Sequence, residues 1–140
     1  MSESNDNYRL ADKTIVITGA AGHIAREYCH LVAKLGARCV LLDRRGGDVG
    51  HIASKLPASA LGLHLSYQID LSSKVQIEEC AGWLASELGA VDVLINNAAF
   101  TGDSKLTGWV TEFENQSAET WNDAISVNLT ASFLLSQKLA

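Results

Sequence analysis

The stretch TIVITGAAGHIA, residues 14–25, decides the fold. Its first five residues are a β-branched run that is typical of a short buried strand, and apolar residues recur at helical spacing from His23 onward. Between these two segments, Gly19 permits a sharp turn, Gly22 lets the backbone approach a ligand closely, and Ala25 is small enough for tight helix–strand packing. A strand, a glycine turn and a helix in this order predict a dinucleotide-binding βαβ unit.

The turn between strand and helix is the expected phosphate-binding site. A pyrophosphate carries two negative charges, and free backbone N–H groups at the start of a helix hold it well when no side chain blocks its approach. We therefore expect the cofactor to contact five residues of this turn: Gly19, Ala21, Gly22, His23 and Ile24. A glycine pair is a weak signal on its own, and a tight turn without a ligand is the alternative. The strand before the turn and the helix after it favour the ligand.

A second apolar run, residues 39–42, ends at Asp43, about twenty residues beyond the turn. A carboxylate at this position can accept hydrogen bonds from both ribose hydroxyls of NAD. Its charge also opposes the 2′-phosphate of NADP, because two like charges ~4 Å apart repel by ~4 kcal/mol at an effective dielectric of about 20. Arg44 and Arg45 could instead pair with a 2′-phosphate, although such residues are more commonly solvated loop charges. The pattern predicts NAD as the cofactor and favours it over NADP.

Apolar spacing alternates between strand and helix periods along the rest of the chain. Two further strands are expected at residues 61–69 and 91–95, and helices are expected at about 49–56, after Ser72 or Ser73 and after Ser117. Four strands alternating with helices predict an α/β fold of the Rossmann type, a doubly wound parallel sheet with its ligand at the carboxyl ends of the strands. We expect a frayed lead-in at residues 1–12 and one nucleotide-binding domain over residues 13–140.

The two later helices have distinct predicted features. Ser73 and Gln76 fit a capping box, and the helix that follows has an apolar stripe of Ile77, Cys80, Ala81, Leu84 and Leu88. The helix after Ser117 is expected to share one face among Trp121, Ile125, Asn128, Ser132, Leu135 and Leu139. The long loop before it is a candidate substrate loop, in which Trp109 and Phe113 either line the site or serve packing.

Composition excludes several classes of protein. The net charge is −5 and the eleven Lys and Arg are scattered, so the basic patch of a nucleic-acid binder is missing. No apolar run approaches the ~18 residues of a membrane span, and no apolar signal peptide precedes the first strand. The three cysteines lack a C-x-x-C pair and the four histidines lack the paired spacing of a zinc site. We expect a cytoplasmic protein with reduced thiols, without metal, nucleic acid or membrane as partners.

Three further motifs follow the turn in order: Asp70-Leu71, Asn96-Asn97-Ala98-Ala99 and Asn128-Leu129-Thr130. With them the sequence resembles the short-chain dehydrogenase/reductase family over nearly the whole chain after the lead-in. The resemblance implies an NAD(P)-dependent oxidoreductase that transfers hydride between nicotinamide and the carbonyl or alcohol of a small, sugar-derived substrate.

The resemblance also implies roles for single residues. Asp70, followed by Leu71, would contact the adenine ring, and Asn97, Ala98 and Ala99 would line the adenosine side and steady the sheet. A helix cap is the plainer interpretation of Asp70. Asn128 would be the asparagine of the catalytic tetrad. Its plainer interpretation is a core amide whose partners avoid a desolvation cost of about 1–3 kcal/mol.

Two features of the sequence leave alternatives open. In the commonest family pattern, glycines follow the first glycine by four and six positions, where this chain has His23 and Ala25. Gly22 falls one position earlier, which resembles the extended branch that includes sugar-nucleotide epimerases and dehydratases. The Asn-Asn-Ala-Ala segment and Asn128 match the single-domain dehydrogenase branch, which we favour because two motifs outweigh one glycine.

The catalytic residues of the family are the second open point. Its members use a serine, a tyrosine and a lysine four residues after the tyrosine. Tyr8, Tyr28 and Tyr67 are not followed by a lysine at that distance. We expect these groups beyond Ala140, so that the chain is the amino-terminal half of a dehydrogenase, inactive alone, whose last helix packs against a partner in a homo-oligomer. A non-catalytic nucleotide-binding module is the third alternative.

Overall fold

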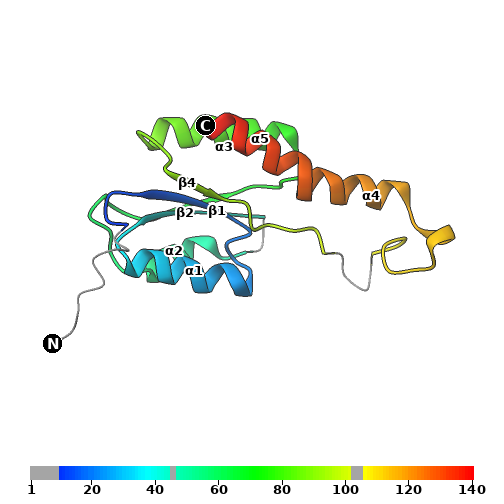
Figure 1. Ribbon diagram of the computed structural model, residues 1–140, viewed down its shortest axis with the longest axis horizontal. Helices are drawn as coiled ribbons and strands as arrows, with labels where there is room; N and C mark the ends of the chain where they lie inside the picture. Colours follow the sequence, from blue (N-terminus) through cyan, green and yellow to red (C-terminus); the bar gives the residue numbers. More distant parts are fainter. Residues whose placement is uncertain (1–9, 45–46, 102–105) are drawn as a thin grey trace.

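The computed structural model describes residues 10–44, 47–101 and 106–140, which form a parallel sheet between two layers of helices (Figure 1). The strand order is β3-β2-β1-β4, and all pairs are parallel. The strands are β1 (Thr14–Thr18), β2 (Arg38–Asp43), β3 (Leu65–Gln68) and β4 (Val93–Ile95). The Rossmann-type fold class predicted from the sequence is confirmed.

Two helices lie against each face of the sheet (Figure 1). One face is covered by α1 (His23–Lys34) and α2 (Val49–Lys55), the other by α3 (Lys74–Glu87) and α5 (Ala131–Leu139). Before α5 come a 3-10 turn η2 (Phe113–Asn115), α4 (Ala118–Ile125) and the π-helical turn η3 (Ser126–Thr130). Figure 1 shows α4 reaching beyond the carboxyl end of the sheet.

The central strands are apolar along their whole length because helices cover both of their faces. Every residue of β1 is buried, and so are the four inner residues of β2. Alternate residues enter different cores: Ile15, Ile17, Cys39 and Leu41 pack with α1 and α2, whereas Val16, Val40 and Leu42 pack with α3 and α5. This double burial is why continuous β-branched and aliphatic runs predicted these two strands well.

The segment just before β1 packs against the end of α1. The Leu10 N–H donates to the Leu35 carbonyl at 2.8 Å, and Leu10 contacts the core on the α1 side of the sheet. Gly36 has φ +99°, and a Cβ there would lie 2.9 Å from the Ala11 Cα. Leu10 and Ala11 of the expected lead-in therefore lie against the end of α1, and residues 1–9 lie outside the described part of the chain.

The third strand is shorter than the sequence predicted. The alternating leucines suggested a strand from residue 61, but Gly62 has φ +107° and the strand begins only at Leu65. Leu65 is the first residue that finds a partner, Val40 of β2. Leu61 and Leu63 are exposed, so their alternation does not mark a buried face. The predicted strand at 91–95 is likewise limited to Val93–Ile95, the residues that pair with β1.

The last predicted helix is interrupted by η3, and its predicted face is correct after this turn, where Leu135 is buried and Leu139 packs on the core, but wrong before it. A π turn inserts one extra residue, which rotates the following side chains by about 100° relative to the preceding helix. The buried residues are Thr120, Ala124, Ala131 and Leu135. Trp121 and Ile125, predicted to share the face of Leu135, are 59% and 37% exposed.

Helix α3 matches its prediction in most respects. Its predicted stripe, Ile77, Cys80, Ala81, Leu84 and Leu88, is buried. The Ser73 hydroxyl accepts a hydrogen bond from the Gln76 N–H at 3.4 Å, as a capping box requires. The second half of the box differs, because the Gln76 side chain accepts from the Asp70 N–H at 2.9 Å rather than from Ser73.

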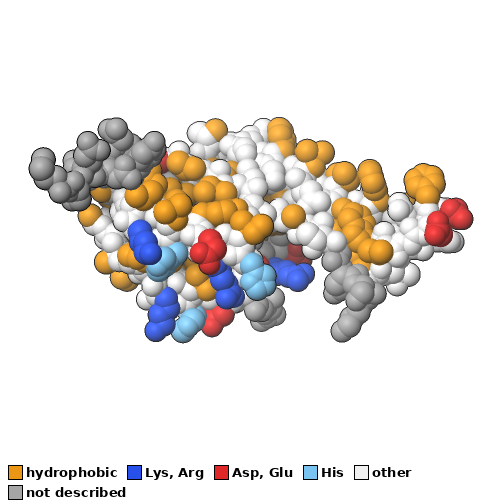
Figure 2. Space-filling view, turned by 60° about the horizontal axis from the view of Figure 1, so that its bottom comes forward, with side chains coloured by type: hydrophobic (Ala, Val, Ile, Leu, Met, Phe, Trp, Pro, Cys, Tyr) orange, Lys and Arg blue, Asp and Glu red, His pale blue; other side chains and the backbone are white. Residues whose placement is uncertain are grey.

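The three cysteines are buried free thiols. Burial raises the pKa of Cys29 to about 11 and the pKa values of Cys39 and Cys80 to about 12. Among the described residues, no three His, Cys, Asp or Glu side chains are grouped to hold a metal ion. None of the described helices is long and apolar enough to cross a membrane. Figure 2 shows a face where basic, histidine and acidic side chains are interspersed beside an apolar area.

A pair of leucines tests this account of the core. Leu41→Ala should lower the free energy of unfolding by about 2–5 kcal/mol, because Leu41 is fully buried in β2 and its loss leaves a cavity. Leu63→Ala should change it by no more than about 0.5 kcal/mol, because the Leu63 side chain is 83% exposed. Denaturant titration measures both. Equal losses in the two variants would contradict the assignment of Leu63 to an exposed segment.

Candidate functional site

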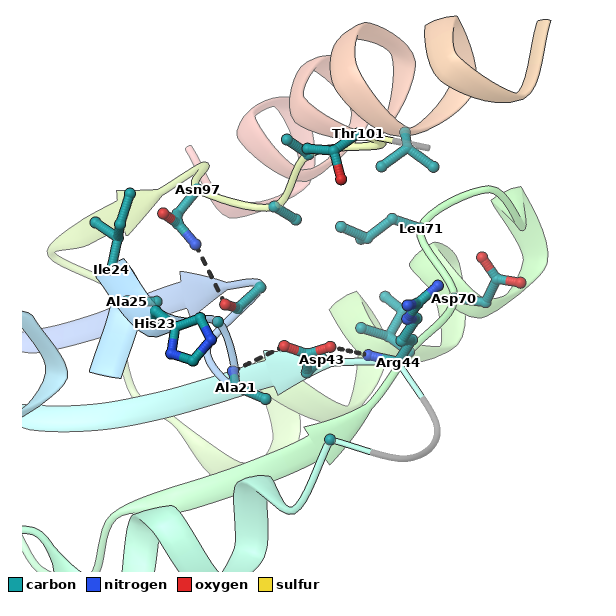
Figure 3. Close-up of a pocket in the computed structure, with 17 residues that line it drawn as sticks. Ala21, His23, Ile24, Ala25, Asp43, Arg44, Asp70, Leu71, Asn97 and Thr101 are labelled. Carbon is teal, nitrogen blue, oxygen red and sulfur yellow. Dashed lines mark hydrogen bonds between the residues drawn. The ribbon is translucent and has the colours of Figure 1, made fainter. Parts of the chain in front are cut away.

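A cavity of about 860 Å³ lies at the carboxyl ends of the strands (Figure 3). Parallel α/β sheets bind their ligands at this edge. All twelve residues that the sequence predicted as cofactor contacts line the cavity: Gly19, Ala21, Gly22, His23, Ile24, Asp43, Arg44, Asp70, Leu71, Asn97, Ala98 and Ala99. Five further residues complete its wall: Ala25, Gly47, Ile69, Thr101 and Val127. The carboxyl ends of all four strands thus contribute neighbouring residues to one site.

The glycine turn lies directly against the segment that follows β4. Gly19 has φ +65°, and a Cβ at this position would lie 2.8 Å from the Ala98 Cα. Gly22 is the N-cap of α1 with an ordinary φ of −67°. The first turn of α1 opens on the cavity, and its N–H groups have no carbonyl one turn earlier to bind. This arrangement suits an anionic group.

Asp43 holds the turn from the β2 side. Its Oδ2 accepts a hydrogen bond from the Ala21 N–H at 2.8 Å, and its Oδ1 accepts from the Arg44 N–H at 2.7 Å (Figure 3). Two backbone donors therefore fix the orientation of the carboxylate beside the cavity. Each carboxylate oxygen has a second lone pair and can accept one more hydrogen bond, as a ribose hydroxyl would require.

Gly47 is a cavity residue that the sequence analysis missed. A Cβ at this position would lie 2.8 Å from the Ala21 Cβ and 3.2 Å from the Asp43 Cγ. The missing side chain lets the loop after β2 lie against both residues. A glycine pair such as Gly46-Gly47 indicates a loop, and no local feature of the sequence reveals this long-range contact. Arg45, considered above as a partner for a 2′-phosphate, lies outside the described residues.

Thr18 and Asn97 hold the turn from the β4 side. The Thr18 hydroxyl oxygen accepts hydrogen bonds from the N–H groups of Asn97 and Ala98, each at 3.0 Å, and donates to the Ile95 carbonyl at 3.3 Å. The Asn97 Nδ2 donates to the carbonyls of Thr18 and Gly19 at 3.0 and 3.2 Å. Figure 3 shows Asn97 directed at the turn. The sequence placed Thr18 at the end of the first strand but did not predict it as a site residue.

Asp70 lies at the cavity wall, but its side chain also serves the adjacent turn. Its Oδ1 accepts hydrogen bonds from the Ser72 N–H and hydroxyl at 2.9 and 2.7 Å. These bonds stabilise the turn that precedes α3, whose N-cap is Ser73, so the interpretation of Asp70 as a helix cap is wrong. In Figure 3 Leu71 points into the cavity, whereas the Asp70 carboxylate is directed away from it. An adenine contact of Asp70 stays a prediction.

Asn128 lies in the π turn η3 and does not line the cavity. Its Oδ1 accepts a hydrogen bond from the Phe100 N–H at 2.6 Å, and its Nδ2 donates to the Phe100 carbonyl at 3.4 Å. The amide is therefore satisfied, and it ties the segment after β4 to the helix. Asn128 is exposed, so its interpretation as a core amide is wrong. Single π turns inside helices occur frequently at functional sites. The catalytic role of Asn128 stays a prediction.

The two aromatic candidates for a substrate wall do not line the cavity. Trp109 donates from its indole N–H to the Thr101 carbonyl at 3.0 Å, and its ring packs edge-on against Phe100 with 5.2 Å between centroids. It therefore supports Thr101, which does line the cavity. Phe113 is 86% exposed. Trp109 therefore serves packing. Phe113 neither lines the cavity nor is buried.

Comparison with known proteins gives consistent matches. A family model described as short chain dehydrogenase matches residues 13–140. The chain is 29% identical over 131 residues to the NAD-dependent glycerol dehydrogenase of Listeria innocua. The matched region covers 94% of this chain and 47% of that protein. It is 32% identical over 133 residues to 5-keto-D-gluconate 5-reductase of Escherichia coli, covering 95% of this chain and 49% of that protein.

Solved structures agree with the sequence matches. A short chain dehydrogenase of Shigella flexneri complexed with NADP superposes with a TM-score of 0.77 at 27% identity, over 94% of this chain and 54% of that chain. This chain spans about half the length of the curated relatives that it matches.

Two glycine variants test the geometry of the turn. Gly19→Ala should lower the free energy of unfolding by about 1–3 kcal/mol, because alanine at φ +65° is strained and its Cβ would meet the Ala98 backbone. Gly82→Ala is the matched control, since Gly82 lies inside α3 with nothing within 4 Å of a Cβ. This control should gain about 0.4–1 kcal/mol. Thermal or denaturant unfolding measures both, and a Gly19→Ala variant as stable as the parent chain would contradict the close approach.

Proposed function

The chain belongs to the short-chain dehydrogenase family, and from this membership we propose that its cavity binds NAD for hydride transfer. The proposed reaction interconverts an alcohol and a carbonyl on a small, sugar-derived substrate. When bound, NAD supplies the nicotinamide that accepts or donates the hydride. The observation that carries the proposal is the position of Asp43, whose carboxylate is fixed at the cavity beside the glycine turn.

The preference for NAD follows from the fixed charge of Asp43. Its two backbone hydrogen bonds hold the carboxylate where it is, so the side chain cannot readily turn away from a 2′-phosphate. Arg44 also lines the cavity, and its positive charge would favour the 2′-phosphate of NADP. Its side chain is exposed to solvent, however, where salt screens its charge. Relatives use both cofactors: one is named an NAD-dependent dehydrogenase, and one solved structure contains NADP.

The substrate class is proposed from the relatives. The two curated relatives described above are named for glycerol and for 5-keto-D-gluconate, a polyol and a keto sugar acid.

Thr101 lies across the cavity from Asp43 (Figure 3), on the segment that Asn128 ties to η3. We propose Asn128 as the residue of this chain that positions that segment and the helix backbone for catalysis. The activity of the whole protein is proposed from the family, because the chain spans about half the length of its relatives.

Oligomer formation is proposed from the outer surface of α4 and its continuation. Four large apolar side chains are exposed there: Trp121, Ile125, Leu129 and Phe133. Exposed apolar patches commonly mark interfaces, and the family resemblance implies that this helix packs against a partner subunit. We propose that a second copy of the protein covers it.

A sugar-nucleotide epimerase or dehydratase is the second candidate function, and only the sequence position of Gly22 favours it. Such enzymes restore their cofactor within one turnover, so they retain it tightly. NAD that remains bound to the protein through gel filtration would favour this candidate, whereas freely exchanging NAD with dehydrogenase turnover favours the first. Saturable NAD binding without turnover of the whole protein would indicate the non-catalytic module.

Cofactor preference is tested by Asp43→Asn, which removes the charge while keeping an oxygen that can accept from Ala21. Calorimetric titration of the parent protein should give a lower Kd for NAD than for NADP. In the variant the ratio of the two Kd values should shift toward NADP by about tenfold or more, because the charge repulsion is gone. Asp123→Asn, an exposed carboxylate on α4, is the matched control and should leave the ratio unchanged. Tighter binding of NADP to the parent protein would contradict the proposal.

A further inference from the structure

Tyr28 makes a hydrogen bond that connects α1 to the segment after β4. Its hydroxyl donates to the Asn97 Oδ1 at 2.8 Å, across 69 positions of sequence. Tyr28 is half-buried and does not line the cavity, so it is not placed to touch a ligand there. The bond reaches the cavity only through Asn97, which is part of the wall.

The Asn97 amide is planar, so fixing its oxygen also fixes the direction of its nitrogen. With Oδ1 held by Tyr28, the Nδ2 donates to the Thr18 and Gly19 carbonyls at 3.0 and 3.2 Å. The reverse orientation would place the amide oxygen against two carbonyl oxygens. Tyr28 thus supplies the donor that the amide oxygen needs when the nitrogen holds the turn.

From this chain of contacts we infer that Tyr28 is a positioning residue of the dinucleotide site, which acts through Asn97 on the glycine turn. The turn is held on its other side by the Asp43 bond to the Ala21 N–H. Loss of the Tyr28 hydroxyl leaves the Asn97 amide oxygen without this donor and so loosens one of these two attachments. The N–H groups that face the pyrophosphate then lose part of their preorganisation, which weakens binding. The inference rests on the proposed binding of NAD.

Tyr28→Phe tests the inference, since it removes the hydroxyl and keeps the ring. Calorimetric titration with NAD, at a temperature where both proteins are fully folded, should show a Kd about three- to tenfold higher in the variant, the size expected for one lost hydrogen bond. Tyr67→Phe is the matched control. Tyr67 packs on Trp83 with 4.8 Å between ring centroids and does not line the cavity, so its variant should keep the parent Kd.

A double-mutant cycle with Asn97→Ala distinguishes positioning from simple stabilisation. If Tyr28 acts through Asn97, adding Tyr28→Phe to Asn97→Ala should raise the NAD Kd no further. An unchanged Kd in Tyr28→Phe, even with a lower melting temperature, would overturn the inference by showing a structural role only. A full additional loss in the Asn97→Ala background would overturn it as well. If the parent protein binds neither NAD nor NADP, the proposed function itself fails, which is a distinct outcome.

Discussion

The contact between the Gly19 turn and the segment after β4 is the constraint on which the rest of the site depends. It requires a positive φ and no side chain at Gly19, and it brings Thr18 within reach of two backbone N–H groups beyond β4. Asp43 binds the same turn from the other side, through the Ala21 N–H. The turn is therefore held between neighbouring strands, and α1 starts from it with its N–H groups facing the cavity. Such a preorganised set of donors loses little entropy when an anion binds.

Much of the fold could be predicted from the sequence because its signals are local. β1 and β2 are buried on both faces, so each is a continuous apolar run with a polar residue at its end. The predicted cofactor contacts lie together for a simple topological reason. Each lies at or just beyond the carboxyl end of a parallel strand, and these ends meet at one edge of the sheet. The positions of these residues at successive strand ends were therefore enough to predict that they line one cavity.

The features that the sequence did not predict depend on partners far away in the chain. β3 begins where β2 offers a partner, and the leucines before that point alternate without pairing. The π turn around Asn128 has no local signal, yet it rotates Trp121 and Ile125 away from the buried face. Gly47 and Tyr28 matter through residues that are distant in sequence, Ala21 and Asn97. Periodicity describes one element at a time and cannot report such contacts.

The central claim is that the glycine turn and the end of β2 together bind a nicotinamide dinucleotide. Amide chemical shifts of the 15N-labelled protein, followed by NMR during titration with NAD, test it most directly. The account predicts saturable shifts that are largest at Ala21, Gly22, His23 and Ile24 in the turn and at Arg44 after β2, with little change along the outer surface of α3. Saturating NAD without any shift in the turn, or with shifts confined to α3 and α5, would contradict it.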